Sequence, residues 1–209
     1  MNRLRRLAIL APVSVGLSGL LNGCNGGTPV QFHSTDITGA DFARDFRLTD
    51  HNGTPRSIRD FSGKAVVVFF GFTHCPDVCP TTLARLTAVM RLMADRASDV
   101  QVLLVTLDPE RDGPQLLRSY TTAFHPSFLG LTGSPEDVAR TAKEFRVISE
   151  RRLLSDESKE EKAQLGNYTL DHSAGMYVFD QKGRVRLFIS GGQKAESIAA
   201  DLSLLLDGH

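Results

Sequence analysis

Two cysteines stand four residues apart in the segment GFTHCPDVCP, residues 71–80, and a proline follows each of them. The chain of 209 residues contains three cysteines in all, so this spacing sets Cys75 and Cys79 apart as a pair. Two thiols at this spacing could close a small loop as a structural disulfide, exchange electrons as a reversible redox couple, or bind a metal ion. The segment therefore indicates thiol chemistry of one of these three kinds.

These three kinds of chemistry suit the spacing to different degrees. A structural disulfide is the least favoured, because the stabilisation from a bridge grows with the loop it encloses, and this loop would be very short. A redox couple is compatible, since residues one helical turn apart can have Cα atoms about 6 Å apart, within the disulfide range. Its spacing is one residue longer than the Cys-x-x-Cys of thioredoxin-like enzymes. Soft thiolates favour copper(I) and zinc, but two sulfurs are too few for a closed zinc site.

A metal site would need at least one further ligand, and histidine is the natural candidate. The histidines of the chain are His33, His51, His74, His125, His172 and His209. Their spacing alone does not select one of them. His172 has one argument in its favour, because it lies just before a predicted β-hairpin that packs next to the cysteine loop in a thioredoxin-like fold. The redox couple and the metal site both remain open on these grounds.

The surrounding elements place the cysteines in a loop at the carboxyl end of a buried strand. KAVVVFFGF, residues 64–72, is a nearly continuous run typical of a strand covered on both faces. Apolar residues at helical spacing predict a helix over about 80–97, and VQVLLVTLD, residues 100–108, predicts a second buried strand. Together these form a βαβ unit with parallel strands. A helix that begins right after Cys79 favours anions, so we expect at least one thiol to ionise more readily than a free cysteine.

The rest of the chain completes an α/β domain. In chain order we expect a hairpin over 45–58 that turns at Asn52-Gly53, a helix over about 113–124 capped by Asp112, a short strand over 128–131, a helix from Ser134 to about Phe145, strands over 176–179 and 185–189, and a C-terminal helix that includes 198–206. The charged run 155–164 is typical of a solvated loop. A βαβ unit followed by a ββα unit predicts a thioredoxin-like fold with an N-terminal hairpin extension.

The first 23 residues have the layout of a signal peptide. Three arginines precede an apolar run over residues 7–21, and small residues stand just before Cys24. The run is shorter than the roughly 20 residues that a membrane-spanning helix needs. The pattern resembles a bacterial lipoprotein signal, in which the cysteine is lipidated, and an uncleaved anchor is the alternative. We expect a lipoprotein-type signal peptide over 1–23, lipidation at Cys24, a flexible tether over 24–39 and a folded domain over 40–209.

Charge and compartment narrow the classes of function. Cleavage after residue 23 would remove three arginines and no acidic residue from a chain with 24 basic and 24 acidic residues, leaving 21 against 24. A net charge of about −3 argues against nucleic acid as a partner. The compartment outside the cytoplasmic membrane is oxidising, so Cys75 and Cys79 can form a disulfide there once Cys24 carries lipid.

Three separated segments resemble one known family. FFGFTHCPDVCPTTL, VTLDPERDGP and YTLDHSAGMYVFD are similar to the matching segments of the Sco/SenC proteins, and the resemblance extends over residues 40–207 in the family's order. Proteins of that family are membrane-anchored, copper-binding, thioredoxin-fold factors for the assembly of cytochrome c oxidase. The resemblance implies that residues 40–209 form a thioredoxin-like copper-binding domain.

The resemblance also implies roles for individual residues. Cys75 and Cys79 match the two thiolate ligands of the family's copper site, and His172 matches its histidine ligand. Such a ligand set holds copper(I) three-coordinate, and it holds copper(II) when a further oxygen or nitrogen donor joins. Loading requires deprotonated thiols, so a disulfide between them must be reduced first.

Three carboxylates are expected on the same rim of the sheet. Asp77 lies between the cysteines, and Asp108 and Asp112 belong to the segment DPERD. Asp108 is a candidate to orient His172 or to tune the charge at copper. Turn and helix-cap roles are the alternative for Asp108 and Asp112.

The function that the resemblance implies is a copper metallochaperone for the dicopper centre of cytochrome c oxidase. Its partners would be the dicopper subunit of the oxidase, a periplasmic copper carrier and a thiol reductant. Its location would be the bacterial periplasm, with a lipid anchor in the membrane. The main alternative is a thiol-disulfide reductase that keeps the partner's copper-binding cysteines reduced. A thiol peroxidase is a weaker alternative without a strong cue in the sequence.

Overall fold

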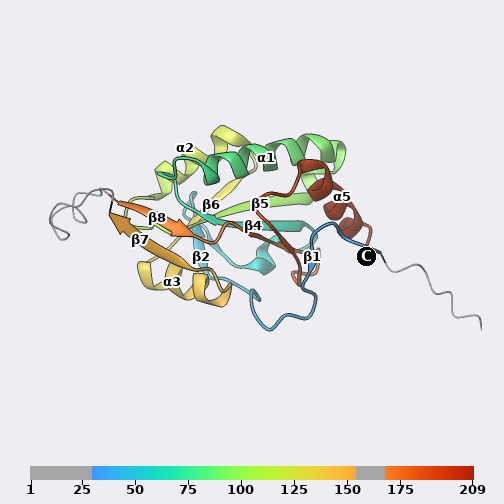
Figure 1. Cartoon of the computed structure of the whole chain (residues 1–209), viewed down its shortest axis with the longest axis horizontal. Helices are drawn as coiled ribbons and strands as arrows, with labels where there is room; N and C mark the ends of the chain where they lie inside the picture. The colour runs from blue at the N-terminus through green and yellow to red at the C-terminus, as the bar shows by residue number, and fades with distance from the viewer. Residues whose placement is uncertain (1–29, 154–167) are drawn as a thin grey trace, which may run out of the picture. The chain divides into compact units, whose positions relative to one another are not determined.

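The computed structural model describes residues 30–153 and 168–209. Within these residues the chain forms an eight-stranded sheet in the order β1-β10-β9-β4-β5-β6-β2-β3, with helices against both of its faces (Figure 1). A second, two-stranded sheet pairs β7 with β8. No helix in the described part of the chain is both long enough and apolar enough to cross a membrane.

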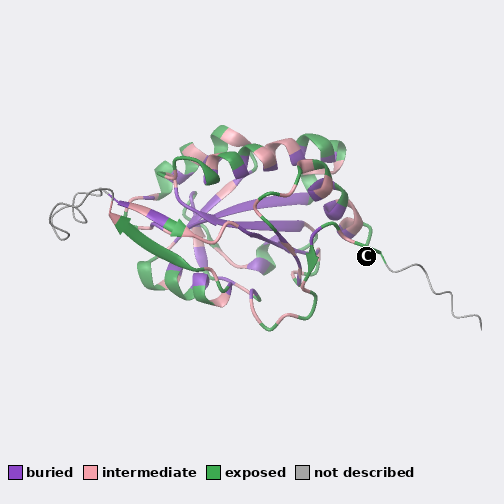
Figure 2. Ribbon diagram, in the orientation of Figure 1, coloured by how far each residue is buried: buried purple, intermediate pink, exposed green. Residues whose placement is uncertain are grey.

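The parallel pair β4 and β5 forms the centre of the large sheet. β4 spans Ala65–Gly71 and β5 spans Val100–Thr106, and every residue of both strands is buried (Figure 2). The two strands pair from Ala65 opposite Val100 to Gly71 opposite Thr106. A strand that is covered on both faces needs apolar side chains on both, which explains the nearly unbroken runs of valine, leucine and phenylalanine.

The other strands extend this pair on both sides. Beyond β5 lie β6 (Leu129–Thr132), β2 (Leu48–Asp50) and β3 (Pro55–Arg56). Beyond β4 lie β9 (Met176–Phe179), β10 (Val185–Ile189) and β1 (Thr35–Asp36). β6 is parallel to β5, whereas β9 runs antiparallel to β4 and β10 antiparallel to β9. The βαβ and ββα units thus share one sheet, and the predicted thioredoxin-like fold with an N-terminal hairpin, here β2–β3, is confirmed.

Helices cover the two faces unequally. One face carries α1 (Val78–Met93), α2 (Pro114–Phe124) and α5 (Ala195–Leu206), and the other carries α3 (Pro135–Glu144) (Figure 1). Two short 3-10 helices, η1 (Ile58–Phe61) and η2 (Ala94–Asp99), precede β4 and β5. Two hydrophobic cores result, one that includes residues of α1, α2 and α5 and one that includes residues of η1 and α3.

Two helix starts differ from the sequence predictions. α1 begins at Val78, so Cys79 lies in its first turn and not just before the helix. The N-cap of α2 is Gly113, and the prediction that Asp112 caps this helix is wrong. The carboxylate of Asp112 is already engaged, because it accepts hydrogen bonds from Thr73 and Thr106. Ser134, in contrast, caps α3 as predicted.

Three strands are missing from the sequence predictions: β1, β7 (Ser149–Leu153) and β8 (Tyr168–His172). β1 falls inside the segment 24–39 that was predicted to be a tether. The buried carboxylate of Asp201 accepts hydrogen bonds from the Ser34 N–H at 2.8 Å and the Ser34 hydroxyl at 2.5 Å, which fixes the residues before β1 to α5. The sheet therefore begins before the predicted domain boundary at residue 40. Cys24 and the charged run 155–164 lie outside the described residues.

Candidate metal centre

Two side chains that are close in sequence and a third that is distant from both converge near the carboxyl end of β4. The ligand atoms of Cys75, Cys79 and His172 all lie within 4.8 Å of one another. The Cys79 Sγ is 3.5 Å from the His172 Nε2, and both cysteines are free thiols. The structure thus brings together the three residues that the sequence singled out, at a separation that one metal ion can bridge.

The start of α1 positions the two sulfurs. The backbone N–H of Cys79 donates to the Cys75 Sγ at 3.4 Å. This N–H belongs to the first turn of the helix, where donors have no partner within the helix. Cys79 is fully buried and Cys75 is half-buried. One sulfur therefore faces the core, and the other is accessible from the surface.

Gly71, the last residue of β4, makes room for the buried sulfur. A Cβ at this position would lie 2.8 Å from the Cys79 Sγ and 3.0 Å from the Phe69 ring. Such contacts are too short, so a glycine is needed for β4 to end directly against Cys79. The sequence interpretation missed this residue, although a glycine at the end of a buried strand is a signal of close approach.

β8 carries His172 to the sulfurs. His172 is the last residue of this strand, opposite Ser149 of β7, and not a loop residue as predicted. Its Nδ1 lies 3.0 Å from the carbonyl oxygen of Ser173, which can only accept a hydrogen bond. We therefore assign the ring proton to Nδ1, which leaves the lone pair of Nε2 facing Cys79. The rings of Phe69 and Phe72 contact the imidazole in edge-on geometry and limit its rotation.

Burial raises the pKa of the Cys79 thiol, and the hydrogen bond with Cys75 acts in the same direction. The helix start was predicted to make a thiol more acidic. At Cys79 the loss of hydration around a thiolate outweighs the dipoles of the nearby N–H groups. This cysteine is therefore a neutral thiol at neutral pH, and a metal must displace its proton to bind.

Asp108 anchors the strand that carries His172. Its buried carboxylate accepts hydrogen bonds from the Tyr168 hydroxyl at 2.6 Å and from the Arg111 Nε at 2.5 Å. Burial, together with the hydrogen bond to Asp108, raises the pKa of Tyr168 to about 12. The Ser173 carbonyl, and not Asp108, faces the ring nitrogen of His172, so the predicted direct orientation by Asp108 is not what the structure has.

Two guanidinium groups complete this anchor. The Arg111 and Arg151 guanidinium carbons lie 3.7 Å and 4.1 Å from the centroid of the Tyr168 ring. Arg111 also donates to the Tyr168 carbonyl oxygen at 3.0 Å. The sequence interpretation missed Tyr168, although the same-face spacing of Tyr168, Leu170 and His172 is a strand pattern.

Asp112 and Asp77 support the cysteine loop without touching the sulfurs. The buried carboxylate of Asp112 accepts from the Thr73 N–H at 3.0 Å and from the Thr106 hydroxyl at 2.7 Å. It therefore ties the loop before Cys75 to the end of β5. Asp77 occupies the N-cap position of α1, and its carboxylate accepts from the Thr81 hydroxyl at 3.3 Å.

The other described histidines do not belong to the cluster. His51 is buried between α2 and β6, where its Nδ1 accepts from the Gly130 N–H at 3.1 Å. The Nδ1 of His125 is 2.8 Å from the Ser127 hydroxyl. These contacts give both rings a structural role. The remaining ones are His33, His74 and His209.

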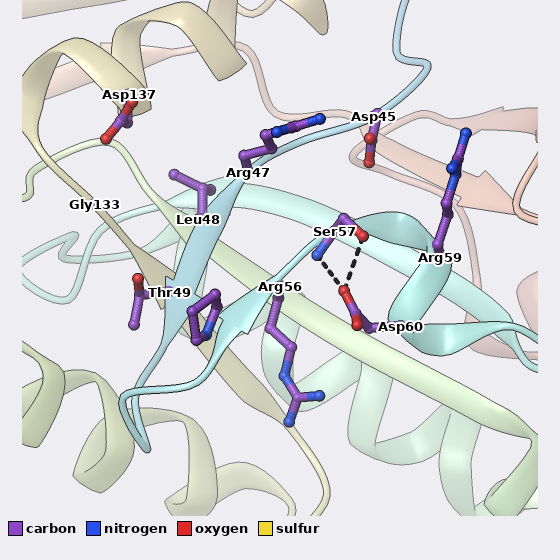
Figure 3. Close-up of a pocket in the computed structure, with 11 residues that line it drawn as sticks. Asp45, Arg47, Leu48, Thr49, Arg56, Ser57, Arg59, Asp60, Gly133 and Asp137 are labelled. Carbon is purple, nitrogen blue, oxygen red and sulfur yellow. Dashed lines mark hydrogen bonds between the residues drawn. The ribbon is translucent and has the colours of Figure 1, made fainter.

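A polar pocket of about 510 Å³ lies at the β2–β3 hairpin, away from the cysteines (Figure 3). Its carboxylates are engaged in local structure: Asp60 accepts from the Ser57 N–H at 2.6 Å and from the Ser57 hydroxyl at 2.8 Å. Asp45 likewise accepts from the Ile58 N–H at 3.0 Å. The pocket has no residue of the Cys-Cys-His cluster in its lining.

Comparison with known sequences gives a consistent result. The sequence model described as SCO1/SenC matches residues 34–207. A zebrafish (Danio rerio) protein named "Protein SCO2 homolog, mitochondrial" is 43% identical over 141 residues, which cover 66% of this chain and 48% of that protein. Its mouse counterpart is 38% identical over 76% of this chain and 60% of that protein. The chain thus spans about half to three fifths of the length of these relatives.

Comparison with solved structures agrees. ScoI of Bradyrhizobium japonicum, solved with copper bound, is 35% identical, with a TM-score of 0.67 over 77% of this chain and 97% of that one. Apo Sco1 of Thermus thermophilus, solved in solution, is 38% identical, with a TM-score of 0.70 over 86% of this chain and 99% of that one. The same fold is therefore found in a metal-bound and in a metal-free relative.

Proposed function

This chain belongs to the SCO1/SenC family, and from that premise we propose that it is a copper metallochaperone for the dicopper centre of cytochrome c oxidase. The observation that carries the proposal is the convergence of Cys75, Cys79 and His172 within 4.8 Å. Two thiolates and an imidazole favour copper(I) over hard cations such as magnesium and calcium. Copper(II) would need a further oxygen or nitrogen donor. The copper-bound ScoI relative supports the choice of metal.

The burial of the ligands suits a metal that is passed on and not kept. Cys79 is buried, whereas Cys75 and His172 are half-buried, so an incoming ligand has access to one edge of the site. A partner's thiolate or imidazole displaces the accessible ligands first and Cys79 last, and the copper is bound at every stage. The copper keeps its oxidation state in this exchange, and each released thiolate takes up a proton.

The substitution His172→Ala tests the copper site. We expect the variant to lose tight copper(I) binding in a competition titration with a chromophoric chelator. The imidazole ligand is gone, and the two sulfurs must hold the ion without it. His125→Ala is the matched control, since its ring lies outside the cluster, and it should bind copper as the unaltered protein does. Maturation of the oxidase by His172→Ala in cells with limiting copper would overturn the chaperone proposal.

The same sulfurs support a second candidate function, a thiol-disulfide reductase for the partner's copper-binding cysteines. The proximity of two free thiols favours it, since oxidation to a Cys75–Cys79 disulfide would release two electrons and two protons to a partner disulfide. A thiol reductant would then have to restore the thiols. His172→Ala separates the two functions, because it should leave disulfide exchange with a model disulfide largely intact.

The remaining proposals concern location and partners. We propose that Cys24 carries a lipid that holds the domain at the bacterial membrane, on its periplasmic side. The dicopper subunit of the oxidase would then receive the metal, and a periplasmic copper carrier would supply it. Incorporation of labelled palmitate by the full chain, and its loss in Cys24→Ser, tests the anchor. Label that persists in Cys24→Ser would contradict it.

A further inference from the structure

An apolar groove of about 660 Å³ runs between α3 and β7. Val138 and Ala142 of α3 form one side, and Leu107 and Val147 contribute from the neighbouring loops. Figure 2 shows that β7 is exposed over most of its length, and Figure 1 places α3 beside it. The groove lies on the face of the large sheet opposite α1, α2 and α5.

Ile148 is the most exposed large apolar residue of this groove. Its relative exposure is 75%, although it stands between the half-buried Val147 and a strand. An isoleucine gains about 1.5–3 kcal/mol on burial, and this side chain forgoes most of that gain in the isolated chain. An exposed apolar side chain beside an apolar groove is the pattern of an interaction surface.

The groove reaches the β7–β8 hairpin that carries His172, because Ser149 of β7 is one of its lining residues. The Ile148 carbonyl oxygen accepts a hydrogen bond from the Ser173 N–H at 3.0 Å, and the Ile148 N–H donates to the Ser173 hydroxyl at 3.2 Å. Ser173 follows His172, and Ser149 lies opposite His172 in the β7–β8 pair. A molecule bound in the groove would therefore contact Ser149, the residue that pairs with the metal ligand His172.

The rim of the groove is positively charged. Lys143, Arg146 and Arg151 line it together with one carboxylate, Glu110. Arg151 is paired with Glu110 at 2.8 Å, and Arg146 is paired with Asp41 at 2.8 Å. Lys143 makes no ion pair within residues 30–153 and 168–209. The rim is therefore complementary to a carboxylate on an incoming molecule.

We propose that this groove docks an apolar, carboxylate-bearing segment of the protein that exchanges copper at the Cys-Cys-His centre. The proposal rests on the function proposed above and adds the surface that the exchange uses. Apolar side chains of the segment cover Ile148 and fill the groove, and a carboxylate faces Lys143. Docking here holds the partner's ligands beside His172, which turns ligand exchange between two proteins into an exchange within one complex.

Two substitutions test the groove. Ile148→Asp places a charge where the partner's apolar side chains would pack, and Lys143→Glu reverses the charge of the rim. Leu92→Asp is the matched control, because Leu92 is 51% exposed on α1, on the other face of the sheet. The probe is the purified soluble dicopper domain of the oxidase, and the readouts are its dissociation constant, the rate of copper(I) transfer and the copper affinity of each variant.

We expect Ile148→Asp to weaken the complex by tenfold or more, about 1.4 kcal/mol, and to slow transfer in proportion. Lys143→Glu should weaken the complex and make its dissociation constant less dependent on salt concentration, since the attraction between Lys143 and the partner's carboxylate is lost. Both variants should keep the copper affinity of the unaltered protein. Transfer by Ile148→Asp at the rate of Leu92→Asp would overturn the groove proposal while leaving the chaperone proposal intact.

Two other outcomes are equally decisive. If the unaltered protein itself fails to bind or transfer copper, the proposed function is wrong. The groove proposal is then wrong as well, because it requires copper exchange at the Cys-Cys-His centre. If Ile148→Asp converts a dimer into a monomer in light scattering without changing transfer, the groove is an interface between two copies of this chain, and the docking proposal is wrong.

Discussion

Gly71 shows how one missing side chain positions a metal ligand. A Cβ there would stand 2.8 Å from the Cys79 Sγ. In Gly71→Ala we expect the Cys79 sulfur to shift and the copper(I) affinity to fall by tenfold or more, about 1.4 kcal/mol. The displaced thiolate and His172 are then less well placed to bind the same ion. A chelator competition measures the affinity. Gly192→Ala is the control, since its Cβ would meet nothing within 4 Å, and equal losses in both variants would contradict the argument.

The cysteine pair was predictable from its spacing, but the histidine and most of the supporting contacts were not. The short spacing of Cys75 and Cys79 indicated thiol chemistry, whereas the spacing of the histidines did not select His172, whose role as a ligand came from the resemblance to the Sco/SenC proteins. Asp108 and Asp112 were predicted near the site, and both are indeed buried close to the loops that carry the ligands. Their distant hydrogen-bond partners, however, are Tyr168 and Thr73, and a contact 60 or 39 positions away leaves no local signal in the sequence.

At the scale of elements, the β7–β8 hairpin determines where His172 lies. The Tyr168 hydroxyl donates to Asp108 at 2.6 Å, and both groups are buried. We expect Tyr168→Phe to lower the free energy of unfolding by about 1–3 kcal/mol, because Asp108 loses a donor, and also to weaken copper binding, because β8 is less firmly held. Chemical denaturation and a copper(I) competition titration measure the two effects on the same preparation.

Tyr177→Phe provides the matched control for this prediction. The Tyr177 hydroxyl also donates a buried hydrogen bond, to the carbonyl oxygen of Phe145, but on the face of the sheet that α3 covers. Loss of this hydrogen bond should lower the free energy of unfolding by a similar amount and leave the copper affinity unchanged. If the two variants weaken copper binding equally, the effect of Tyr168→Phe reflects general destabilisation, and the hairpin does not position His172.

The elements that sequence reasoning found and missed differ in what stabilises them. β4, α1 and β5 bury apolar faces, so their hydrophobic periodicity is visible in the sequence. β7 reads SERRL and is exposed at four of its five positions, so it has no apolar pattern. It is a strand because it pairs with β8 along its whole length and because Arg151 lies against Tyr168. Such tertiary contacts override local propensity.

At the scale of the whole molecule, the metal centre lies at the rim of one of the two hydrophobic cores, of which the buried Cys79 is a member. The two cores lie on either side of β4 and β5 and involve most of the buried side chains. The metal centre lies at one end of these strands, where the cysteine loop and the β7–β8 hairpin meet. Metal binding therefore adds contacts at the edge of a core that is already complete, and the free energy of binding should appear as added stability of the whole domain.

Copper(I) should therefore raise the melting temperature of the reduced protein. Free copper a thousandfold above the dissociation constant adds about 4 kcal/mol, or about 8–16 °C in a domain of this size. The pKa of Cys79 is raised, so this thiol keeps its proton between pH 6 and 8 and must lose it to copper. Lowering the pH by one unit should thus reduce the stabilisation by about 1.4 kcal/mol for each proton released. Calorimetric scans at pH 6, 7 and 8 test this prediction. If the copper-induced increase in melting temperature is independent of pH, or is equally large in the disulfide form, the thiolates are not the ligands.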